Sequence, residues 1–93
     1  MLLDKSSHNQ KDEQGRRQGY WFEEDEHGNV SEGPYENDKR HGQWTERYAD
    51  GEVSEGLYLE GKRHGEWTVR KPDGTVEFWT FYEGKLTAKQ KQN

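Results

Sequence analysis

The stretch Arg40-His41-Gly42-Gln43-Trp44-Thr45 recurs, 23 residues further on, as Arg63-His64-Gly65-Glu66-Trp67-Thr68. The same step holds without insertion or deletion from position 16 to position 85. A fixed period of this length is typical of a protein that stacks one small unit on the next. Function in such a protein is usually carried by rows of equivalent residues. The rows are Trp21, Trp44 and Trp67; Tyr35, Tyr58 and Phe81; Val30, Val53 and Val76; Lys39, Lys62 and Lys85; and Gly28, Gly51 and Gly74.

Aromatic residues make up about half of the apolar content of this chain. Only 26% of the 93 residues are hydrophobic, a value that by itself is typical of disorder. The chain nevertheless has four Trp, five Tyr and three Phe. Because one aromatic side chain buries ~150–250 Å², a dozen can hold a thin sheet together. We therefore expect one small folded domain.

The charge and cysteine content exclude several classes of function. A net charge of -5 disfavours nonspecific binding to nucleic acid or to an anionic membrane. No cysteine is present, which excludes a disulfide framework, a thiolate metal site and a thiol nucleophile. No apolar run approaches the ~20 residues of a membrane span. Polar residues follow Met1-Leu2-Leu3 at once, so a native N-terminus predicts a cytoplasmic protein.

Each unit is predicted to form two short strands. In the second unit these are residues 42–48 and 52–59, joined by Ala49-Asp50-Gly51, because Asp-Gly supplies the positive φ that tight hairpin turns require. Turn glycines are therefore expected at Gly28, Gly51 and Gly74, and further structural glycines at Gly42 and Gly65. The predicted repeat domain is 14–85, with units 17–39, 40–62 and 63–85. Residues 1–13 are predicted to be a flexible lead-in, in which 10–14 add a frayed edge strand. The tail 86–93 is predicted to form one helical turn or to stay loose.

Tight turns between successive strands predict an all-β fold, a single-layer antiparallel meander of about six strands. Val53 and Tyr58 lie an odd number of residues apart, which places them on opposite faces of an ideal strand. Gly56 lies between them, as Gly33 does one unit earlier, and a glycine inside a strand often marks a bulge. We therefore expect bulges at these glycines that gather Trp, Val and Tyr on one concave face. Trp79 replaces the glycine in the third unit, as expected of a unit that covers the end of the stack.

The segment from Tyr58 to Trp67 resembles the central part of MORN repeats (membrane occupation and recognition nexus), and the resemblance extends over positions 16–85. Trp44 and Trp67 stand where that family usually has the second glycine of a Gly-x-Gly step. This variant resembles a bacterial branch of the family that is often labelled antitoxin-like. The resemblance implies a β-hairpin array used as a scaffold or docking surface, and not an enzyme. In larger proteins such repeats are associated with membrane or phospholipid contact.

Two rows are candidate binding surfaces. The aromatic row is either the core or a core that doubles as a docking face, since Trp and Tyr are enriched at binding hot spots. The basic row lies on one edge of the predicted sheet, where it either meets phosphates or carboxylates or deters aggregation. The candidate partner-binding face is Trp21, Trp44, Trp67, Tyr35, Tyr58 and Phe81. The candidate anion or lipid row is Arg16, Arg17, Lys39, Arg40, Lys62, Arg63 and Lys85.

No catalytic or metal constellation is apparent. His41 and His64 are expected ~10 Å apart as copies in successive units, too far to share one metal ion at Zn–N bonds of ~2.0–2.1 Å. Glu32, Glu46, Glu55 and Glu66 are expected to form cross-strand ion pairs with residues such as Arg47 and Arg70. No phosphate loop is present, and no cofactor or metal is expected.

The sequence therefore predicts a noncatalytic protein-binding or scaffold module that uses the aromatic face or an open strand edge. Self-association through strand edges is a further expectation. One alternative is a membrane-surface adaptor that binds anionic phospholipid through the basic row. Another is an inhibitor that neutralises a partner toxin.

Overall fold

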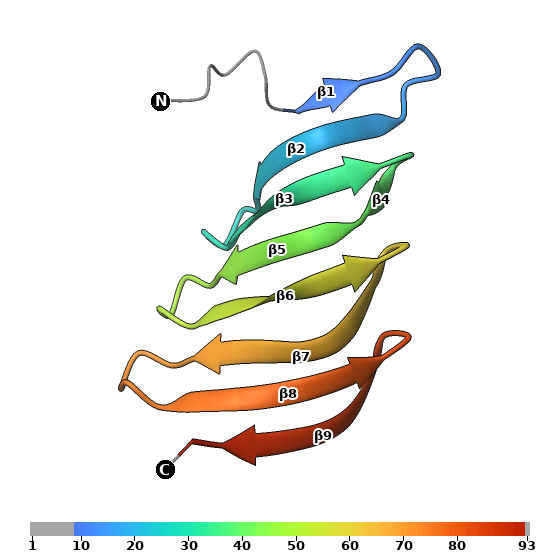
Figure 1. Cartoon of the computed structure of the whole chain (residues 1–93). Coiled ribbons are helices and arrows are strands. Elements are labelled where there is room, and N and C mark those ends of the chain that lie inside the picture. Colours follow the sequence, from blue (N-terminus) through green and yellow to red (C-terminus); the bar gives the residue numbers. More distant parts are fainter. Residues whose placement is uncertain (1–8, 93) are drawn as a thin grey trace, which may run out of the picture.

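The computed structural model describes residues 9–92, and these form one antiparallel sheet without helices (Figure 1). The predicted all-β meander is confirmed, with nine strands in place of about six. Each strand pairs with the next along the chain, except that the short β4 lies beside β3 as an offshoot before β5. The strands are β1 (Gln10–Lys11), β2 (Arg17–Glu24), β3 (Val30–Glu36), β4 (Lys39–Arg40), β5 (Gly42–Arg47), β6 (Val53–Leu59), β7 (Lys62–Arg70), β8 (Val76–Tyr82) and β9 (Lys85–Lys91).

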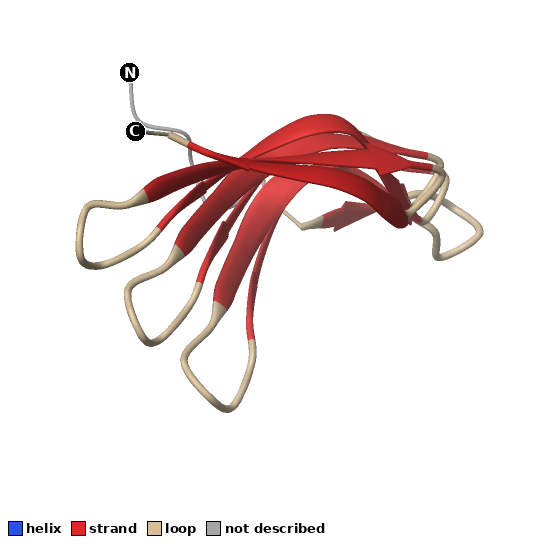
Figure 2. Ribbon diagram, turned by 90° about the horizontal axis from the view of Figure 1, so that it is seen from below, coloured by secondary structure: helices blue, strands red, loops and turns tan. Residues whose placement is uncertain are grey.

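Within residues 9–92 the sheet has no second layer, and its longest dimension is 47 Å. The strands are bent, so the sheet has the form of an arch when it is viewed along the stack of strands (Figure 2). Alternate residues of each strand point to opposite faces. On β6, Ser54, Gly56 and Tyr58 are buried, whereas Val53 and Leu57 are more exposed. We call the face that carries Tyr58 the buried face and the opposite one the outer face.

Two kinds of turn join the strands. At one end of the sheet, Gly28, Gly51 and Gly74 adopt φ of 84°, 98° and 91°, as predicted for turn glycines. Each donates its backbone N–H to the carbonyl three residues earlier, for example Gly51 to Tyr48 at 2.9 Å. At the other end, two-residue turns have positive φ at both positions, as in Glu60-Gly61. Gly42 and Gly65, with φ of 104° and 77°, follow these turns.

The predicted loose or helical tail is wrong for residues 86–91, which form most of β9. The two-residue turn Glu83-Gly84 reverses the chain after β8. Residues 85–91 then run back along β8 from Tyr82 to Glu77, with one register irregularity near Phe81. Backbone pairing with an existing strand edge is available to a polar segment whatever its side chains, so composition gave no signal. The strand predicted within 10–14 is β1, and residues 1–8 lie outside the described part of the chain.

Register irregularities occur at the predicted glycines, but the predicted consequence is wrong. Between Glu55 and Leu57 the β6–β7 pairing shifts, so that the single residue Gly56 of β6 stands opposite positions 65–67 of β7. Because β6 itself keeps its alternation, Val53 stays on the outer face, opposite to Tyr58. Trp, Val and Tyr therefore do not share one face.

The glycines are required because a tryptophan ring lies against them. A Cβ atom on Gly33 would lie 2.5 Å from the Trp44 ring, and one on Gly56 would lie 2.4 Å from the Trp67 ring. On its other side Trp44 pairs directly with Gly56. The tryptophans of β5 and β7 thus each lie against the glycine of the preceding strand, β3 and β6 respectively. The indole N–H of Trp44 donates to the Pro34 carbonyl at 2.8 Å, which fixes the ring over its glycine.

Replacing Gly56 with Ala should destabilise the fold even though alanine is the better strand residue. The added methyl would overlap the Trp67 ring, and overpacking of this kind typically costs ~1–3 kcal/mol. Urea unfolding of Gly56→Ala, Trp67→Leu and the double variant measures the effect. The cost of the alanine should shrink in the Trp67→Leu background; an equal cost in both backgrounds would show that the ring is not its cause.

Candidate functional site

The six predicted aromatic residues form a continuous row of edge-to-face contacts on the buried face. From Trp21 to Phe81 the ring centroids of successive members lie 5.5, 5.3, 5.8, 5.2 and 6.2 Å apart. Contacts of this geometry contribute about 0.5–1.5 kcal/mol each beyond the area buried. The row has one member on each of β2, β3, β5, β6, β7 and β8, so it is the core of the sheet.

The aromatic row offers little surface to a partner. Trp44 and Trp67 have no exposed surface, and Tyr35, Tyr58 and Phe81 are 6–8% exposed. Only Trp21, at the first end of the row, is partly open. A ligand would have to displace other side chains to reach these rings, so the row serves the fold in this conformation.

Three arginines of the predicted basic row cover the aromatic core. The guanidinium carbon of Arg17 lies 4.3 Å from the Tyr35 ring centroid, that of Arg40 lies 4.4 Å from Trp44, and that of Arg63 lies 4.6 Å from Trp67. Cation–π contacts with desolvated rings contribute up to about 2 kcal/mol. These arginines are therefore structural groups, and the sequence gave no means of separating them from the neighbouring lysines.

A polar triad binds each inner arginine to a glutamate and a tyrosine. In one unit the Tyr35 hydroxyl donates to Glu23 at 2.9 Å, and the Arg40 guanidinium lies 3.5 Å from the same carboxylate. One period later Tyr58 donates to Glu46 at 3.2 Å and Arg63 donates to it at 3.0 Å.

Burial alone would lower the pKa of Arg63, but its hydrogen bond to Tyr58 and the charge of Glu46 outweigh burial and raise it. Burial is also the largest cause of the raised pKa of Tyr35. Arg63 therefore stays charged and Tyr35 stays neutral at ordinary pH.

The third unit replaces the whole triad with apolar residues. Val69, Phe81 and Leu86 occupy the positions that Glu46, Tyr58 and Arg63 hold one period earlier. Val69 is 1% exposed and Phe81 is 7% exposed, so these positions remain in the core. Joint replacement leaves no polar group buried without a partner, which is the condition under which such an exchange costs little.

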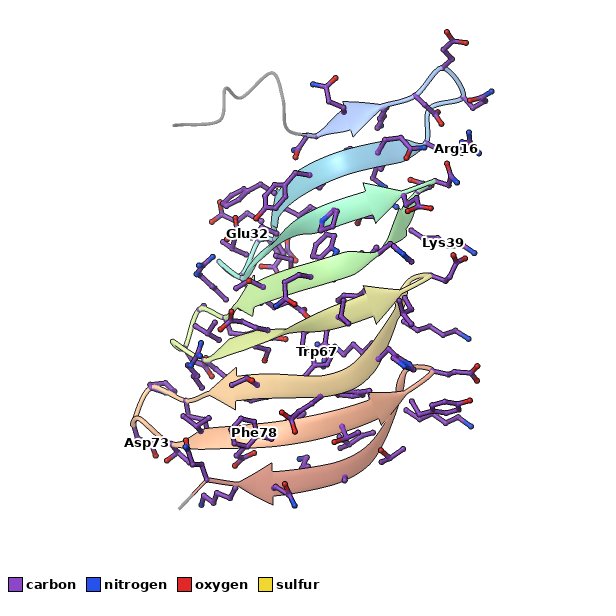
Figure 3. All side chains as sticks on the ribbon, in the orientation of Figure 1. Arg16, Glu32, Lys39, Trp67, Asp73 and Phe78 are labelled. Atoms are coloured by element: carbon purple, nitrogen blue, oxygen red, sulfur yellow. The ribbon has the colours of Figure 1, made fainter. Side chains whose placement is uncertain are left out.

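The lysines of the basic row remain on the surface. Lys39, Lys62 and Lys85 are exposed and each follows a two-residue turn. Lys39 lies 3.7 Å from Glu60, and Arg16 lies 2.7 Å from Asp12. Arg16 and Lys39 lie at the same end of the strands, opposite to Glu32 and Asp73 (Figure 3).

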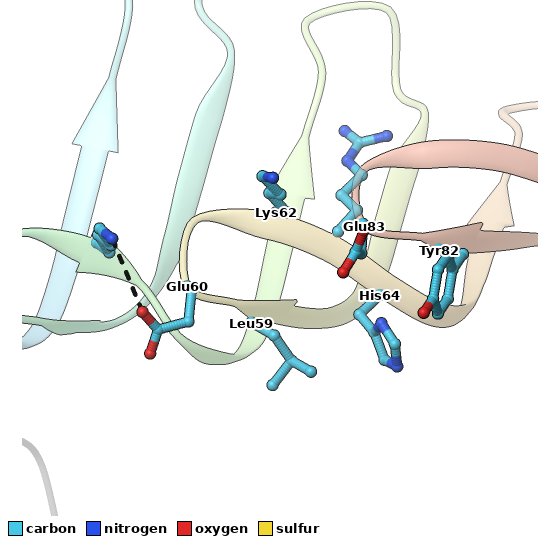
Figure 4. A pocket seen from close by; sticks show the side chains of 8 residues that line it. Leu59, Glu60, Lys62, His64, Tyr82 and Glu83 are labelled. Atoms are coloured by element: carbon cyan, nitrogen blue, oxygen red, sulfur yellow. Dashed lines mark ion pairs between the residues drawn. The ribbon is translucent and has the colours of Figure 1, made fainter.

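The outer face carries ion pairs and one hollow. The predicted cross-strand pairs form between Arg47 and Glu32 at 2.5 Å and between Arg70 and Glu55. Near the turns, a hollow of about 390 Å³ is lined by Leu59, His64 and Tyr82 together with charged residues. These three side chains project to the same side (Figure 4), and the rings of His64 and Tyr82 lie 6.0 Å apart. Leu59 was not among the site residues predicted from the repeat.

The last strand, β9, has a free edge. Among the described strands it pairs only with β8, and all seven of its residues are exposed. The backbone N–H of Gln92 donates to the Val76 carbonyl at 2.9 Å. Antiparallel pairs alternate between bonded and non-bonded positions, so Gln90 and Ala88 also face β8. Lys89 and Lys91 consequently direct their backbone N–H and C=O groups away from the sheet.

The end of the sheet is closed on its buried face by an exchange of residues. Trp79 stands where glycine is found in the inner units, and Gln90 stands where the next tryptophan would be. Trp79 therefore fills from β8 the space that a ring from the following strand fills elsewhere. Lys89 lies over it, with its ammonium 4.1 Å from the ring centroid. The hydrophobic core is therefore covered at this end of the sheet, whereas the outer backbone edge of β9 has no partner among the described strands.

The described residues, 9–92, show no cluster of metal ligands. They contain no group of three or more His, Asp or Glu side chains placed to hold a metal ion. They also contain no helix long and apolar enough to cross a membrane.

Comparison with models of known protein families finds no match. A search of curated proteins likewise finds no similar sequence.

Sequence reasoning missed β9 as a site because Lys85-Leu86-Thr87-Ala88-Lys89-Gln90-Lys91 has neither the glycine nor the tryptophan of a unit. The sequence feature that could have predicted β9 is the position of Lys85 in the repeat. It continues the row of Lys39 and Lys62, and a segment of strand length without Gly or Pro follows it.

Giving the second unit the apolar residues of the third tests the triads. Glu46→Val alone should cost ~1–3 kcal/mol, because it leaves Tyr58 and Arg63 without their acceptor. The triple variant Glu46→Val, Tyr58→Phe, Arg63→Leu should cost at least ~1 kcal/mol less than the sum of its three single changes, measured by urea unfolding. The control is Glu55→Val on the outer face, expected within ~1 kcal/mol of the parent. Strictly additive costs would show that the three groups are not coupled.

Proposed function

We propose that this chain is a noncatalytic protein-binding module that recruits an extended segment of a partner by strand addition at β9. The free edge of β9 carries the proposal. It offers seven exposed residues and outward backbone groups at Lys89 and Lys91. Strand addition uses such main-chain groups for affinity and neighbouring side chains for selectivity.

The burial of the aromatic row favours the strand edge over the aromatic face as the docking surface. Trp44 and Trp67 have no surface to contribute, whereas every residue of β9 is exposed. The resemblance of the repeat to MORN units agrees with a scaffold role. Inhibition of a partner toxin would be one instance of this kind of docking.

Binding to anionic phospholipid is less favoured, because three of the seven residues of the basic row serve the fold. Arg17, Arg40 and Arg63 are packed on aromatic rings. The remaining lysines belong to a chain of net charge -5, which repels an anionic surface.

Replacing Lys89 with Pro should weaken binding at this edge about tenfold without unfolding the sheet. The substitution removes an N–H that points away from β8, and proline is tolerated at such edge positions. The matched control, Lys89→Thr, loses the same lysine side chain and its contact with Trp79 but keeps the N–H.

The measurement uses displayed peptides of about ten residues selected on the parent protein. Selected peptides should lose no more than one exposed ion pair on binding Lys89→Thr, and should bind Lys89→Pro about tenfold more weakly than Lys89→Thr, the range expected for one net backbone hydrogen bond. Circular dichroism should show both variants folded. Equal binding to Lys89→Pro, or a failure to select any peptide, would contradict strand addition at β9.

A further inference from the structure

We infer that the segment recruited at β9 is acidic, with carboxylates opposite Lys89 and Lys91 and an apolar residue near Leu86; this inference rests on the proposed function. The strand reads Lys-Leu-Thr-Ala-Lys-Gln-Lys and contains no Asp or Glu. It is a basic strip on a chain whose net charge is -5.

The lysines of this strip form no ion pair within the described residues, although Lys89 also lies over the Trp79 ring. Within residues 9–92, ion pairs engage Arg17, Arg40, Arg47, Arg63 and Arg70, but none engages Lys85, Lys89 or Lys91. The carboxylate directly across from Lys91 is Glu77. Glu77 accepts from the Trp79 indole at 2.8 Å and lies 3.5 Å from Lys71. An exposed cation without a carboxylate contact is the group that an acidic ligand can pair with.

Two of these lysines, Lys89 and Lys91, are also the residues whose backbone N–H and C=O groups point away from β8. Lys89 pairs with Trp79, Lys91 with Glu77 and Leu86 with Phe81, so all three belong to the buried-face side of β9. An added strand would place residues directly opposite them, at Cβ separations of ~4.5–5.5 Å. Carboxylates at the positions facing Lys89 and Lys91 would therefore form cross-strand pairs.

Leu86 supplies the apolar part of the recognition. It lies across from Phe81, the last buried ring of the row, yet it is 46% exposed. The side that faces away from β8 is uncovered by any described strand. A branched apolar residue of the incoming segment would cover it and extend the core by one contact.

The same lysines argue against a second copy of β9 as the occupant. Pairing two β9 edges would bring two sets of three lysines together, and like charges directly opposite one another are destabilising. The strip thus discriminates against self-pairing while it favours an acidic partner.

Three synthetic peptides test the inference. The first alternates Thr and Glu over ten residues and has one Val near its C-terminus; the second replaces every Glu with Gln, and the third replaces every Glu with Lys. Fluorescence anisotropy should show the acidic peptide binding about tenfold more tightly than the Gln peptide, the combined effect of two or three exposed ion pairs. The Lys peptide should not bind. Raising the salt from ~0.02 M to ~0.3 M should weaken only the acidic peptide, because it screens exposed charges.

Charge variants locate the effect. Lys89→Gln with Lys91→Gln should remove the preference for Glu over Gln while retaining the outward N–H groups. The matched control is Lys39→Gln with Lys62→Gln, which removes two exposed lysines at the turns and should leave the preference unchanged.

The outcomes separate the two proposals. Equal binding of the Glu and Gln peptides, both weakened in Lys89→Pro, would overturn the acidic partner and leave strand addition standing. Peptide binding as tight in Lys89→Pro as in Lys89→Thr would overturn strand addition itself. Sedimentation velocity should give the same oligomeric state for the parent chain and for Lys89→Pro. A dimer of the parent that is absent in Lys89→Pro would identify a second copy as the occupant and overturn the inference.

Discussion

The contact on which the sheet depends is that of a tryptophan ring against a backbone without a side chain. In a single layer nothing covers a hydrophobic face from above, so burial has to come from neighbours within the sheet. Trp44 over Gly33 and Trp67 over Gly56 achieve this by letting an indole lie flat on the preceding strand. The tyrosines then meet the rings edge to face. The curvature of the sheet and the complete burial of these rings are two aspects of one packing arrangement.

Polar groups complete the core where a second layer would otherwise be needed. Arg40 and Arg63 lie over the rings and are held there by the carboxylates of Glu23 and Glu46. The guanidinium plane is suited to this position because it combines a flat face with a charged rim. The third unit lacks this arrangement, because Val69, Phe81 and Leu86 stand in place of Glu46, Tyr58 and Arg63.

The repeat made much of the fold predictable, since a period with turn glycines at one phase and Trp at another restricts the chain to stacked hairpins. The strands of the inner units and the phase of Gly51 and Gly74 followed from it directly. The face on which Val53 lies did not follow from it, because a glycine inside a strand indicates a bulge, and the contact of Gly56 with the Trp67 ring is not apparent from the sequence. Most of β9 was not predicted, because pairing through backbone groups does not require particular side chains. The role of Arg63 was not predicted, because the sequence alone does not distinguish an arginine that stacks on an aromatic ring from one that is exposed to solvent.

The seating of a tryptophan on the previous strand also affects how this chain can change its length in evolution. Loss or gain of one residue inside a unit would move Trp67 off Gly56 and turn the following strand over. Duplication of one whole period would instead supply a new ring, a new glycine and a new arginine in phase. The inner units are thus interchangeable modules, whereas the segment from Trp79 to Lys91 has Trp79 in place of the glycine and Gln90 in place of the tryptophan that such an exchange needs. Copy number is the variable that such a gene can alter most safely.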